Sequence, residues 1–393
     1  MRRLSLIFAS LLGLAFPGNC FAAETPIGLY LRDGILMRAG QPYRGVGVNY
    51  FSLFSRLIED GKIDSSLQSL KQLSKAGVPF VRFMAGGFWP RDWHLYQSNP
   101  QEYFRRFDRV VRAAEEAQIG LIPSLFWHYP TAPDLVGEPV DQLGNPDSKT
   151  TAFIRRYTEE IVSRYRDSPA IYAWEFGNEY ALGADLPNAA TQRPQIVPEL
   201  GTPRTRSARD ELTSQAAIQA CSIFAKEVRR HDATRPIISG NALPRISAWH
   251  NTREKSWKAD SAAQFQEILL RDNPDPLSCL SVHAYPPADG KFPAPARNMT
   301  GLIHEVAQIS RDSHRPLFIG EFGAIQKGDD LAGQRSAVEE FLRSLEIEKV
   351  PLAALWVFDL KDQEATLNVT FDGARKDFLD LLVKTNRRLS KMD

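Results

Sequence analysis

The feature that most restricts the fold of this chain is a regular alternation of short apolar runs with longer amphipathic segments. The apolar runs have the length of β-strands and lie near residues 45–50, 79–84, 119–126, 170–176, 235–240, 278–283, 315–320 and 351–357. The segments between and after them have helical periodicity and lie near residues 64–76, 101–117, 150–166, 208–231, 260–272, 296–312, 331–348 and 373–387. Eight strand–helix repeats predict an α/β fold, a single (β/α)8 barrel of the TIM type.

The helical period is clearest near residues 101–117, where one face collects Phe104, Phe107, Val110, Val111 and Ala114. The main alternative for alternating strands and helices is an open, doubly wound sheet. Such a sheet favours a glycine-rich turn between its first strand and a helix. Residues 44–50 lack the third glycine of that turn and lead directly into no helix. We therefore expect the closed barrel.

The chain has 393 residues, which is more than the roughly 250 of a minimal barrel. We expect part of the surplus in an N-terminal hairpin, Leu29–Met37, which turns at Asp33-Gly34 and closes the barrel floor. Much of the rest falls in two long connections after the third and fourth strands, near 129–149 and 181–208. Because the active site of a barrel lies among the loops after its strands, these connections should wall the catalytic face.

Charge and composition exclude several classes of protein. Lys and Arg total 48 against 47 Asp and Glu, so the chain lacks the basic balance typical of nucleic-acid binding. Hydrophobic residues make up 43% of the chain, which supplies a core and excludes a mainly disordered protein. We expect a monomer.

The first 22 residues have the pattern of a secretory signal peptide. Arg2 and Arg3 precede an apolar run, Leu4 to Phe16, and small residues follow near Ala22. The run is shorter than the roughly 20 residues of a membrane-spanning helix, and an uncleaved anchor is the alternative. We expect a secreted or periplasmic protein with no stable membrane insertion after cleavage, whose residues 23–393 form one domain.

Two cysteines remain after the predicted cleavage, Cys221 in a helical pattern and Cys279 at the start of a strand. In an oxidising compartment they could form one disulfide. Two buried thiols are an equal alternative, and no motif makes either residue a nucleophile.

Polar and charged residues gather where the predicted strands end, and two of them are carboxylates on facing strands. Glu179 follows the fourth strand and Glu321 ends the seventh. A charged group within an apolar run is unfavourable unless it is paired. Two carboxylates facing each other across a barrel mouth are the arrangement that hydrolyses a glycosidic bond. Glu175, which lies on the same side of its strand as Glu179, fits a structural carboxylate that pairs with Arg82 or with a group of strand six.

An ordered set of residues at these strand ends resembles glycoside hydrolase family 5. That family has an Arg on strand two, a His after strand three, Asn-Glu after strand four, a His and a Tyr at strand six, a Glu after strand seven and a Trp on strand eight. The matching residues are Arg82, His128, Asn178, Glu179, His283, Tyr285, Glu321 and Trp356. The resemblance covers nearly the whole chain and implies a glycoside hydrolase catalytic domain over residues 23–393.

The resemblance implies a retaining mechanism that uses two glutamates. Glu179 would be the general acid/base, so its pKa should be raised, and Glu321 would be the nucleophile, which must be ionised. Arg82 would keep Glu321 charged, and Tyr285 would hydrogen-bond it. Double displacement requires carboxyl groups about 5–5.5 Å apart.

The remaining residues of the set would bind the substrate. Asn178 would hold the sugar 2-hydroxyl, and Trp356 would lie under the sugar at the cleaved bond, with His128 and His283 in the same site. Aromatic rings pack on the C–H faces of sugars, and three more are possible subsite platforms: Trp89, Trp127 and Tyr180.

The resemblance implies a β-linked polysaccharide or oligosaccharide as substrate, of the β-1,4-mannan or β-1,4-glucan type, and endo action. Two alternatives remain, a catalytically inactive barrel that binds polysaccharide and an exo-acting β-glycosidase of the same clan. No metal or other cofactor is expected, because the first strand has no His-x-His pair and the chain offers no spaced His/Asp ligand set.

Overall fold

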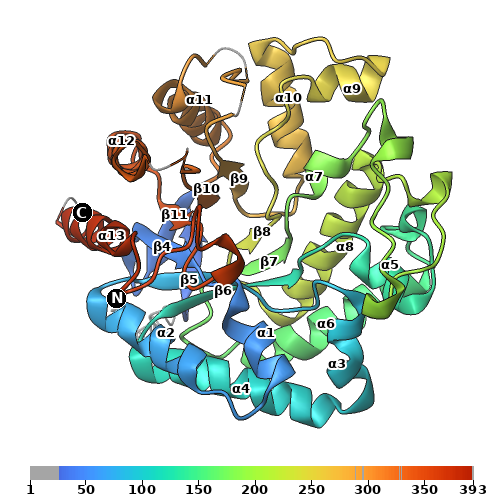
Figure 1. Ribbon diagram of the computed structural model, residues 1–393, viewed down its shortest axis with the longest axis horizontal. Coiled ribbons are helices and arrows are strands. Elements are labelled where there is room, and N and C mark those ends of the chain that lie inside the picture. Colours follow the sequence, from blue (N-terminus) through green and yellow to red (C-terminus); the bar gives the residue numbers. More distant parts are fainter. Residues whose placement is uncertain (1–25, 288, 294–295, 327, 329, 392–393) are drawn as a thin grey trace, which may run out of the picture.

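A parallel sheet of eight strands forms the centre of the computed structural model, which describes residues 26–391 except 288, 294, 295, 327 and 329. The predicted signal peptide lies outside these described residues. The strands follow one another around the barrel in the order β8-β7-β6-β5-β4-β11-β10-β9 (Figure 1). Their bounds are β4 (Gly45–Asn49), β5 (Phe80–Met84), β6 (Gly120–Phe126), β7 (Trp174–Gly177), β8 (Ile237–Ile238), β9 (Leu280–Ala284), β10 (Leu317–Phe322) and β11 (Leu352–Leu355). The predicted (β/α)8 barrel is confirmed.

The barrel is least tightly closed between β8 and β9. β8 has only two residues, and no strand ladder joins it to β9 within the described part of the chain. Near the bottom of this seam the Ser278 N–H donates to the Ile237 carbonyl at 2.8 Å. Near the top the Leu243 N–H donates to the His283 carbonyl at 3.3 Å. The Ile237 N–H also donates to Ser278 Oγ at 3.1 Å. Isolated hydrogen bonds therefore join the two sides of this seam in place of a ladder.

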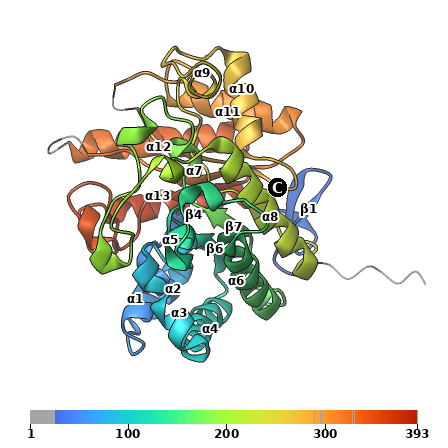
Figure 2. The same ribbon diagram turned by 90° about the vertical axis from the view of Figure 1, so that its right-hand side faces the viewer.

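Helices surround the sheet on the outside of the barrel (Figures 1 and 2). They are α1 (Ser52–Glu59), α2 (Ser65–Ala76), α3 (His94–Ser98), α4 (Pro100–Ala117), α5 (Thr131–Val136), α6 (Lys149–Tyr165), α7 (Tyr180–Gly183), α8 (Ser214–His231), α9 (Ala248–Glu254), α10 (Ala262–Asp272), α11 (Met299–Asp312), α12 (Leu331–Ile347) and α13 (Lys376–Leu389). The short helices α1, α3, α5, α7 and α9 were not predicted, because so few turns show little periodicity.

The helix predicted near 208–231 begins later than expected, at Ser214. Residues Ala208–Asp210 form a separate 3₁₀ turn, closed by reciprocal hydrogen bonds between Ser207 and Asp210. The Thr213 hydroxyl then accepts the Ala216 N–H as the N-cap of α8. Two successive caps, at Ser207 and Thr213, thus divide a segment that periodicity alone predicts as one helix.

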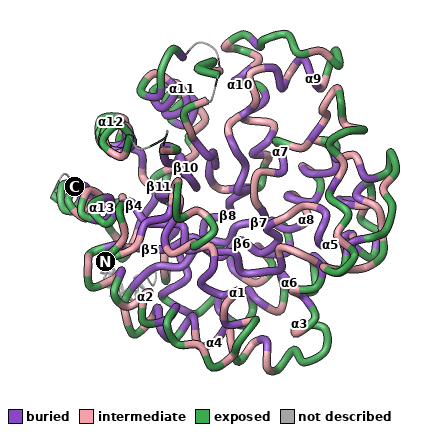
Figure 3. The backbone as a smooth tube through the Cα atoms, viewed as in Figure 1, coloured by how far each residue is buried: buried purple, intermediate pink, exposed green. Residues whose placement is uncertain are grey.

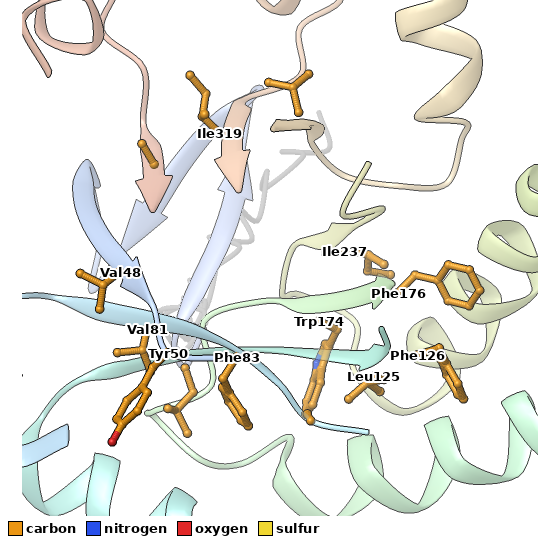
Figure 4. Close-up of a cluster of buried hydrophobic side chains, with 14 of the residues drawn as sticks. Val48, Tyr50, Val81, Phe83, Leu125, Phe126, Trp174, Phe176, Ile237 and Ile319 are labelled. Carbon is orange, nitrogen blue, oxygen red and sulfur yellow. The ribbon is translucent and has the colours of Figure 1, made fainter. Parts of the chain in front are cut away.

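Strand residues that point outward pack against the inner faces of the helices and form the main core. Figure 4 shows part of this cluster, in which Val48, Val81 and Phe83 of neighbouring strands lie with Trp174 and Phe176. Figure 3 shows the same division along the chain, with buried strands in the centre and exposed segments at the periphery. This core fixes the strands and therefore the side chains at their ends.

The N-terminal hairpin closes the floor of the barrel, as predicted. β1 (Leu29–Arg32) and β2 (Ile35–Arg38) pair antiparallel, and a short β3 (Gln41–Pro42) extends them. At the turn Asp33 and Gly34 both have positive φ, 52° and 75°, as a two-residue hairpin turn requires. The hairpin contributes to a second buried cluster of inward-pointing strand residues: Leu29, Leu36, Phe80, Ile122, Tyr172 and Phe318.

The two long connections at the catalytic face are folded together. Arg206, in the connection after β7, forms a buried ion pair at 2.6 Å with Asp134, in the connection after β6. A second carboxylate, Asp210, lies 3.5 Å from the same guanidinium. Gly201 also lies against Pro90, in the loop after β5. These contacts make the connections a fixed wall of the barrel rim.

Two observations concern the expected compartment. Cys221 and Cys279 are both buried and free, so of the two alternatives the structure has the pair of thiols. Among the residues that the structure describes, no helix combines the length and the apolar character needed to cross a membrane.

Candidate active site

Strand alternation brings a layer of polar side chains into the upper barrel interior. Phe80 of β5 belongs to the apolar floor cluster, and Arg82 lies two residues further along the same strand. Ala173 and Glu175 have the same relation at β7. Because side chains two residues apart share one face of a strand, Arg82 and Glu175 lie directly above the floor. Their 2.7 Å ion pair, fully buried, confirms the structural role expected for Glu175.

Glu321 reaches this interior through an irregularity of β10. Phe318 faces the floor cluster, so a regular strand would turn Glu321, three residues later, to the outside. The register of β10 against β9 shifts between Ile319 and Glu321, and Glu321 is paired with His283. One extra residue turns the following side chains to the opposite face. Gly320 fits the crowded bulge, where a Cβ atom would lie 2.8 Å from His283 Nε2.

Glu179 lies two residues beyond β7, in a left-handed backbone conformation with φ 55° and ψ 29°. This conformation is unfavourable for a residue with a side chain. The Glu179 N–H donates to the Gly240 carbonyl at 2.8 Å. Gly240 itself has positive φ, and its close approach to Gly177 leaves no room for a Cβ atom. The loops after β7 and β8 thus hold the Glu179 side chain over the barrel mouth.

The carboxyl groups of Glu179 and Glu321 lie close together. One oxygen from each, together with the Nδ1 atom of His283, lies within 4.8 Å of the other two atoms. Inverting glycosidases need about 6.5–9.5 Å between their carboxyl groups to admit a water, whereas retaining enzymes need about 5–5.5 Å. The spacing suits direct attack by one carboxylate on a sugar.

Glu321 is held by a cation on one oxygen and a phenol on the other. Arg82 Nη1 donates to Glu321 Oε1 at 2.9 Å, and the Tyr285 hydroxyl donates to Oε2 at 2.7 Å. Burial, reinforced by the neighbouring Glu321 charge, raises the pKa of Tyr285 well above its ordinary value, so the phenol stays a donor. Both contacts were expected from the sequence, and both favour the ionised carboxylate.

Arg82 is fixed by hydrogen bonds on every side. Its guanidinium donates to Glu175, to Asn49 Oδ1 at 2.9 Å and to Asn178 Oδ1 at 2.8 Å, besides Glu321. Burial alone would lower the pKa of Arg82, but the charges of Glu175 and Glu321 outweigh it and the pKa is raised. The cation therefore persists at every pH at which the protein is folded.

Glu179 has a less polar environment. Burial raises its pKa, and the more distant charge of Arg82 offsets this only in part. Its Oε1 atom lies 3.1 Å from His283 Nδ1. Burial also lowers the pKa of His283 to about 4, so this imidazole is neutral near pH 7. A protonated Glu179 can donate to a neutral His283, and the ionised form can accept from it.

Some of the predicted aromatic residues are half-buried at the mouth of the site, and others are buried. Trp356 is half-buried, and its Nε1–H donates to Gln363 Oε1 at 2.8 Å, which fixes the ring beside Trp127. Trp89 is also half-buried at the rim, next to His128. Trp127 is buried, and the Arg82 guanidinium carbon lies over its ring, 4.6 Å from the ring centroid.

Tyr180 and His128 have mainly packing contacts. Tyr180 is buried, and its hydroxyl donates to the Phe126 carbonyl, so its ring is part of the core. His128 stacks on Phe88 at 5.1 Å between ring centroids. Burial lowers the pKa of His128 to about 4, so it too is neutral near pH 7.

Sequence reasoning missed two residues that support the site. Asn49, at the end of β4, donates to the Gly320 carbonyl at 2.9 Å besides accepting from Arg82, and so links β10 to the guanidinium carried by β5. Its place at the end of the first barrel strand is the signal that could have identified it. Gln363, which holds Trp356, ends a short 3₁₀ helix, Lys361–Gln363, where no pattern marks it.

The spacing of Glu179, His283 and Glu321 would also suit three ligands of a metal ion. The surroundings of Glu321 argue against a metal ion, because Arg82 already lies 2.9 Å from the same Glu321 oxygen that faces His283. A divalent ion there would adjoin a buried guanidinium. The donor set therefore does not fit a resident metal.

Comparison with known families agrees with this geometry. The model of a family described as cellulase (glycosyl hydrolase family 5) matches residues 40–358. The chain belongs to glycosyl hydrolase family 5. Among curated proteins, a probable mannan endo-1,4-β-mannosidase C of Aspergillus terreus is 37% identical over 95 residues, which are 21% of this chain. The match spans 23% of that relative's length.

Solved structures of similar fold cover nearly the whole chain. An endo-1,4-β-mannanase from Rhizomucor miehei aligns with a TM-score of 0.65 at 16% identity, over 93% of this chain and 99% of its own. An exo-β-1,4-mannosidase from Opitutaceae bacterium strain TAV5 aligns with a TM-score of 0.62 at 18% identity, over 92% of this chain and 62% of its own. At these identities the similarity shows the shared barrel.

Proposed function

We propose that this family 5 protein is a retaining β-glycoside hydrolase that cleaves β-1,4-mannan by endo action. Glu321 is the nucleophile and Glu179 the general acid/base. The observation that carries the proposal is the pair of adjacent carboxyl groups in opposite environments. Glu321 is bound by a guanidinium and a phenol, whereas burial beside a neutral imidazole raises the pKa of Glu179.

In the first step Glu321 attacks the anomeric carbon while the bond from that carbon to the leaving oxygen breaks. Glu179 gives its proton to the leaving oxygen. In the second step Glu179, now ionised, takes a proton from water, and the water oxygen displaces Glu321 from the anomeric carbon. Two inversions give net retention.

The surroundings of the two residues support their exchange of states. While Glu321 carries the sugar as an ester, it has no negative charge. The pKa of Glu179 then falls, because a nearby like charge that disfavoured ionisation has gone. Arg82 and Tyr285 accommodate the returning charge on Glu321 in the second step. Glu179 can therefore act as acid first and as base afterwards.

The sugar at the cleaved bond would lie between the carboxylates and Trp356. We assign its 2-hydroxyl to Asn178, whose side chain is held by Arg82. We assign His128 and Trp89 to the rim of the same site, since they adjoin one another there. Trp127 and Tyr180 are assigned to support rather than to sugar contact, because both are buried.

Mannan is the proposed glycan because the curated relative with 37% identity is named a mannan endo-1,4-β-mannosidase. The two solved structures of similar fold are named for endo and for exo action on mannosidic bonds. Endo action is proposed because that curated relative is named for it. We also propose export from the cytoplasm, on the basis of the N-terminal pattern.

The test uses β-1,4-manno- and β-1,4-gluco-oligosaccharides of four to six units. Time-resolved NMR should show the β-anomer first, together with internal cleavage of the manno series. Inversion would overturn the double displacement, and release of single terminal sugars would establish exo action instead. Binding without turnover across both series would identify an inactive carbohydrate-binding barrel.

A further inference from the structure

A groove opens beside Glu179, and its lining includes His283 and Tyr285 but not Glu321. Its volume is about 410 Å³, and it lies between the loops that follow β8 and β9. Glu179 forms part of its inner end, whereas Glu321 and Trp356 do not line it. Its walls are mainly apolar, with Leu243 and Trp257 on one side and Pro287 and Pro293 on the other.

Trp257 stands out in this groove because its large apolar side chain is exposed rather than packed in the core. The residue is 56% exposed. Within the described part of the chain no aromatic ring stacks on it, and no hydrogen bond of its indole is seen. A large exposed apolar ring next to a catalytic group points to a ligand.

The loop that carries Trp257 is a built structure. Asp260 accepts hydrogen bonds from the backbone N–H groups of Trp249 and His250 and lies 2.7 Å from His250 Nδ1. The Asn251 side chain donates to the Ser256 carbonyl at 2.7 Å. Trp257 is therefore presented on a fixed frame, which lowers the entropy lost when a ligand stacks on it.

Arg245 joins this frame to the segment that follows Glu179. Its guanidinium donates to the carbonyls of Ala181, Leu182 and Ala184 and to Asn251 Oδ1. All of its nitrogens are thus occupied by protein groups, although it lines the groove. Besides apolar surface and the occupied Arg245, the lining includes Lys291 and Asp289, two exposed groups of opposite charge 3.9 Å apart. Apolar walls whose charges are paired with one another suit a neutral ligand with C–H faces.

We propose that this groove binds the leaving-group sugars of the cleaved glycan, with Trp257 as their stacking platform. The assignment rests on the proposed function, because the general acid must touch the leaving oxygen and Glu179 is the catalytic group at the groove's inner end. The nucleophile side, with Trp356, holds the sugar that stays on the enzyme. Trp257 is thus a specificity residue for the departing part of the substrate.

The test compares two substrates that differ only in the leaving group. β-Mannobiosyl fluoride releases fluoride and places nothing in the groove, whereas mannohexaose fills it. Trp257→Ala should lower kcat/KM for mannohexaose by about tenfold or more. The kcat/KM for the fluoride should stay within about twofold of the wild-type value. Trp257→Phe, which keeps a ring, should recover much of the loss.

Trp249→Ala is the matched control, because Trp249 lies on the same loop, bonds Glu267 and does not line the groove. It should leave both substrates unchanged. An equal effect of Trp257→Ala on both substrates, or no effect on either, overturns the groove assignment alone. A wild-type protein that turns over neither substrate overturns the proposed function and the groove together.

Discussion

Glu179 and Glu321 lie side by side at the barrel mouth, yet their surroundings differ in almost every respect. The Glu321 side chain is 6% exposed and contacts a guanidinium and a phenol. The Glu179 side chain is 30% exposed, lies against a neutral imidazole and lines an apolar groove. Glu321 therefore contacts donors that stabilise a negative charge, whereas burial raises the pKa of Glu179 and favours its protonated form.

This contrast teaches that the chemical roles belong to the environments rather than to the residues. Pairs of titratable groups whose environments separate their pKa values are the usual basis of acid and base assignments. Here Arg82 and Tyr285 define the Glu321 side, and His283 with the groove defines the Glu179 side. Each of the following experiments removes one element of the contrast.

The largest effect is expected from Glu321→Ala. Without the nucleophile, kcat on a β-mannoside should fall by at least about 10⁴-fold. Added azide can enter the vacated space and attack directly, so NMR should show a glycosyl azide of inverted configuration. The exposed surface carboxylate of Glu116 supplies the control, since Glu116→Ala should keep full activity. An azide product of retained configuration would contradict the nucleophile assignment.

Glu179→Gln should act selectively on substrates that need a proton. Loss of general acid catalysis should reduce kcat/KM on mannohexaose by about 10²–10⁴-fold. A dinitrophenyl glycoside needs no proton for departure, so glycosylation should remain fast and azide should trap a product of retained configuration. Steady-state and burst kinetics on the two substrates measure the difference. An equal loss on both would show that Glu179 is not the acid.

Arg82→Met should show how much the buried cation contributes to the unfolding free energy. It leaves the buried carboxylates of Glu175 and Glu321 without their cation, which should cost about 3–5 kcal/mol of unfolding free energy. Urea unfolding measures this change. Lys71→Met breaks an exposed pair with Glu116 and should cost at most about 1 kcal/mol. Similar values for the two variants would show that the buried network does not depend on Arg82.

The smallest effect concerns stability and pH at Glu179. Its pKa in the folded protein is raised, so folding favours the protonated form. The wild-type protein should lose stability from this residue as pH rises from the ordinary glutamate pKa through the raised value. Glu179→Gln lacks this loss, so its melting temperature should gain on wild type between pH 4 and pH 8. A pH-independent difference would show that burial does not disfavour the Glu179 charge.

Much of the barrel could be predicted, because its signals are local. The Asp33-Gly34 turn, the eight apolar runs and the longer helices follow from turn chemistry and periodicity. The pairing of Arg82 with Glu175 was also accessible, since both point into the barrel interior, from β5 and β7 on either side of β6. The split before α8 was not, because the cap at Thr213 competes with a continuous helical pattern.

Residues outside regular elements were the hardest to place. Trp257 lies in an irregular loop and Gln363 ends a three-residue 3₁₀ helix, and neither segment has a period that says which way a side chain points. Tyr180 was predicted as a sugar platform because it follows the end of a strand, yet the turn after β7 directs it into the core. Among aromatic residues the chain alone could not separate a ring that packs from a ring that stays open.

The sequence by itself determined the barrel and the identity of the chemical groups at its mouth. Strand and helix periods depend on residues close together in the chain, and the site residues follow one another along the chain in a fixed order. The tertiary structure decided which way those groups face. The bulge at Gly320 turns Glu321 inward, and the left-handed backbone at Glu179 depends on Gly240, about sixty residues away in the chain. Both depend on contacts between strands, which no single stretch of sequence contains.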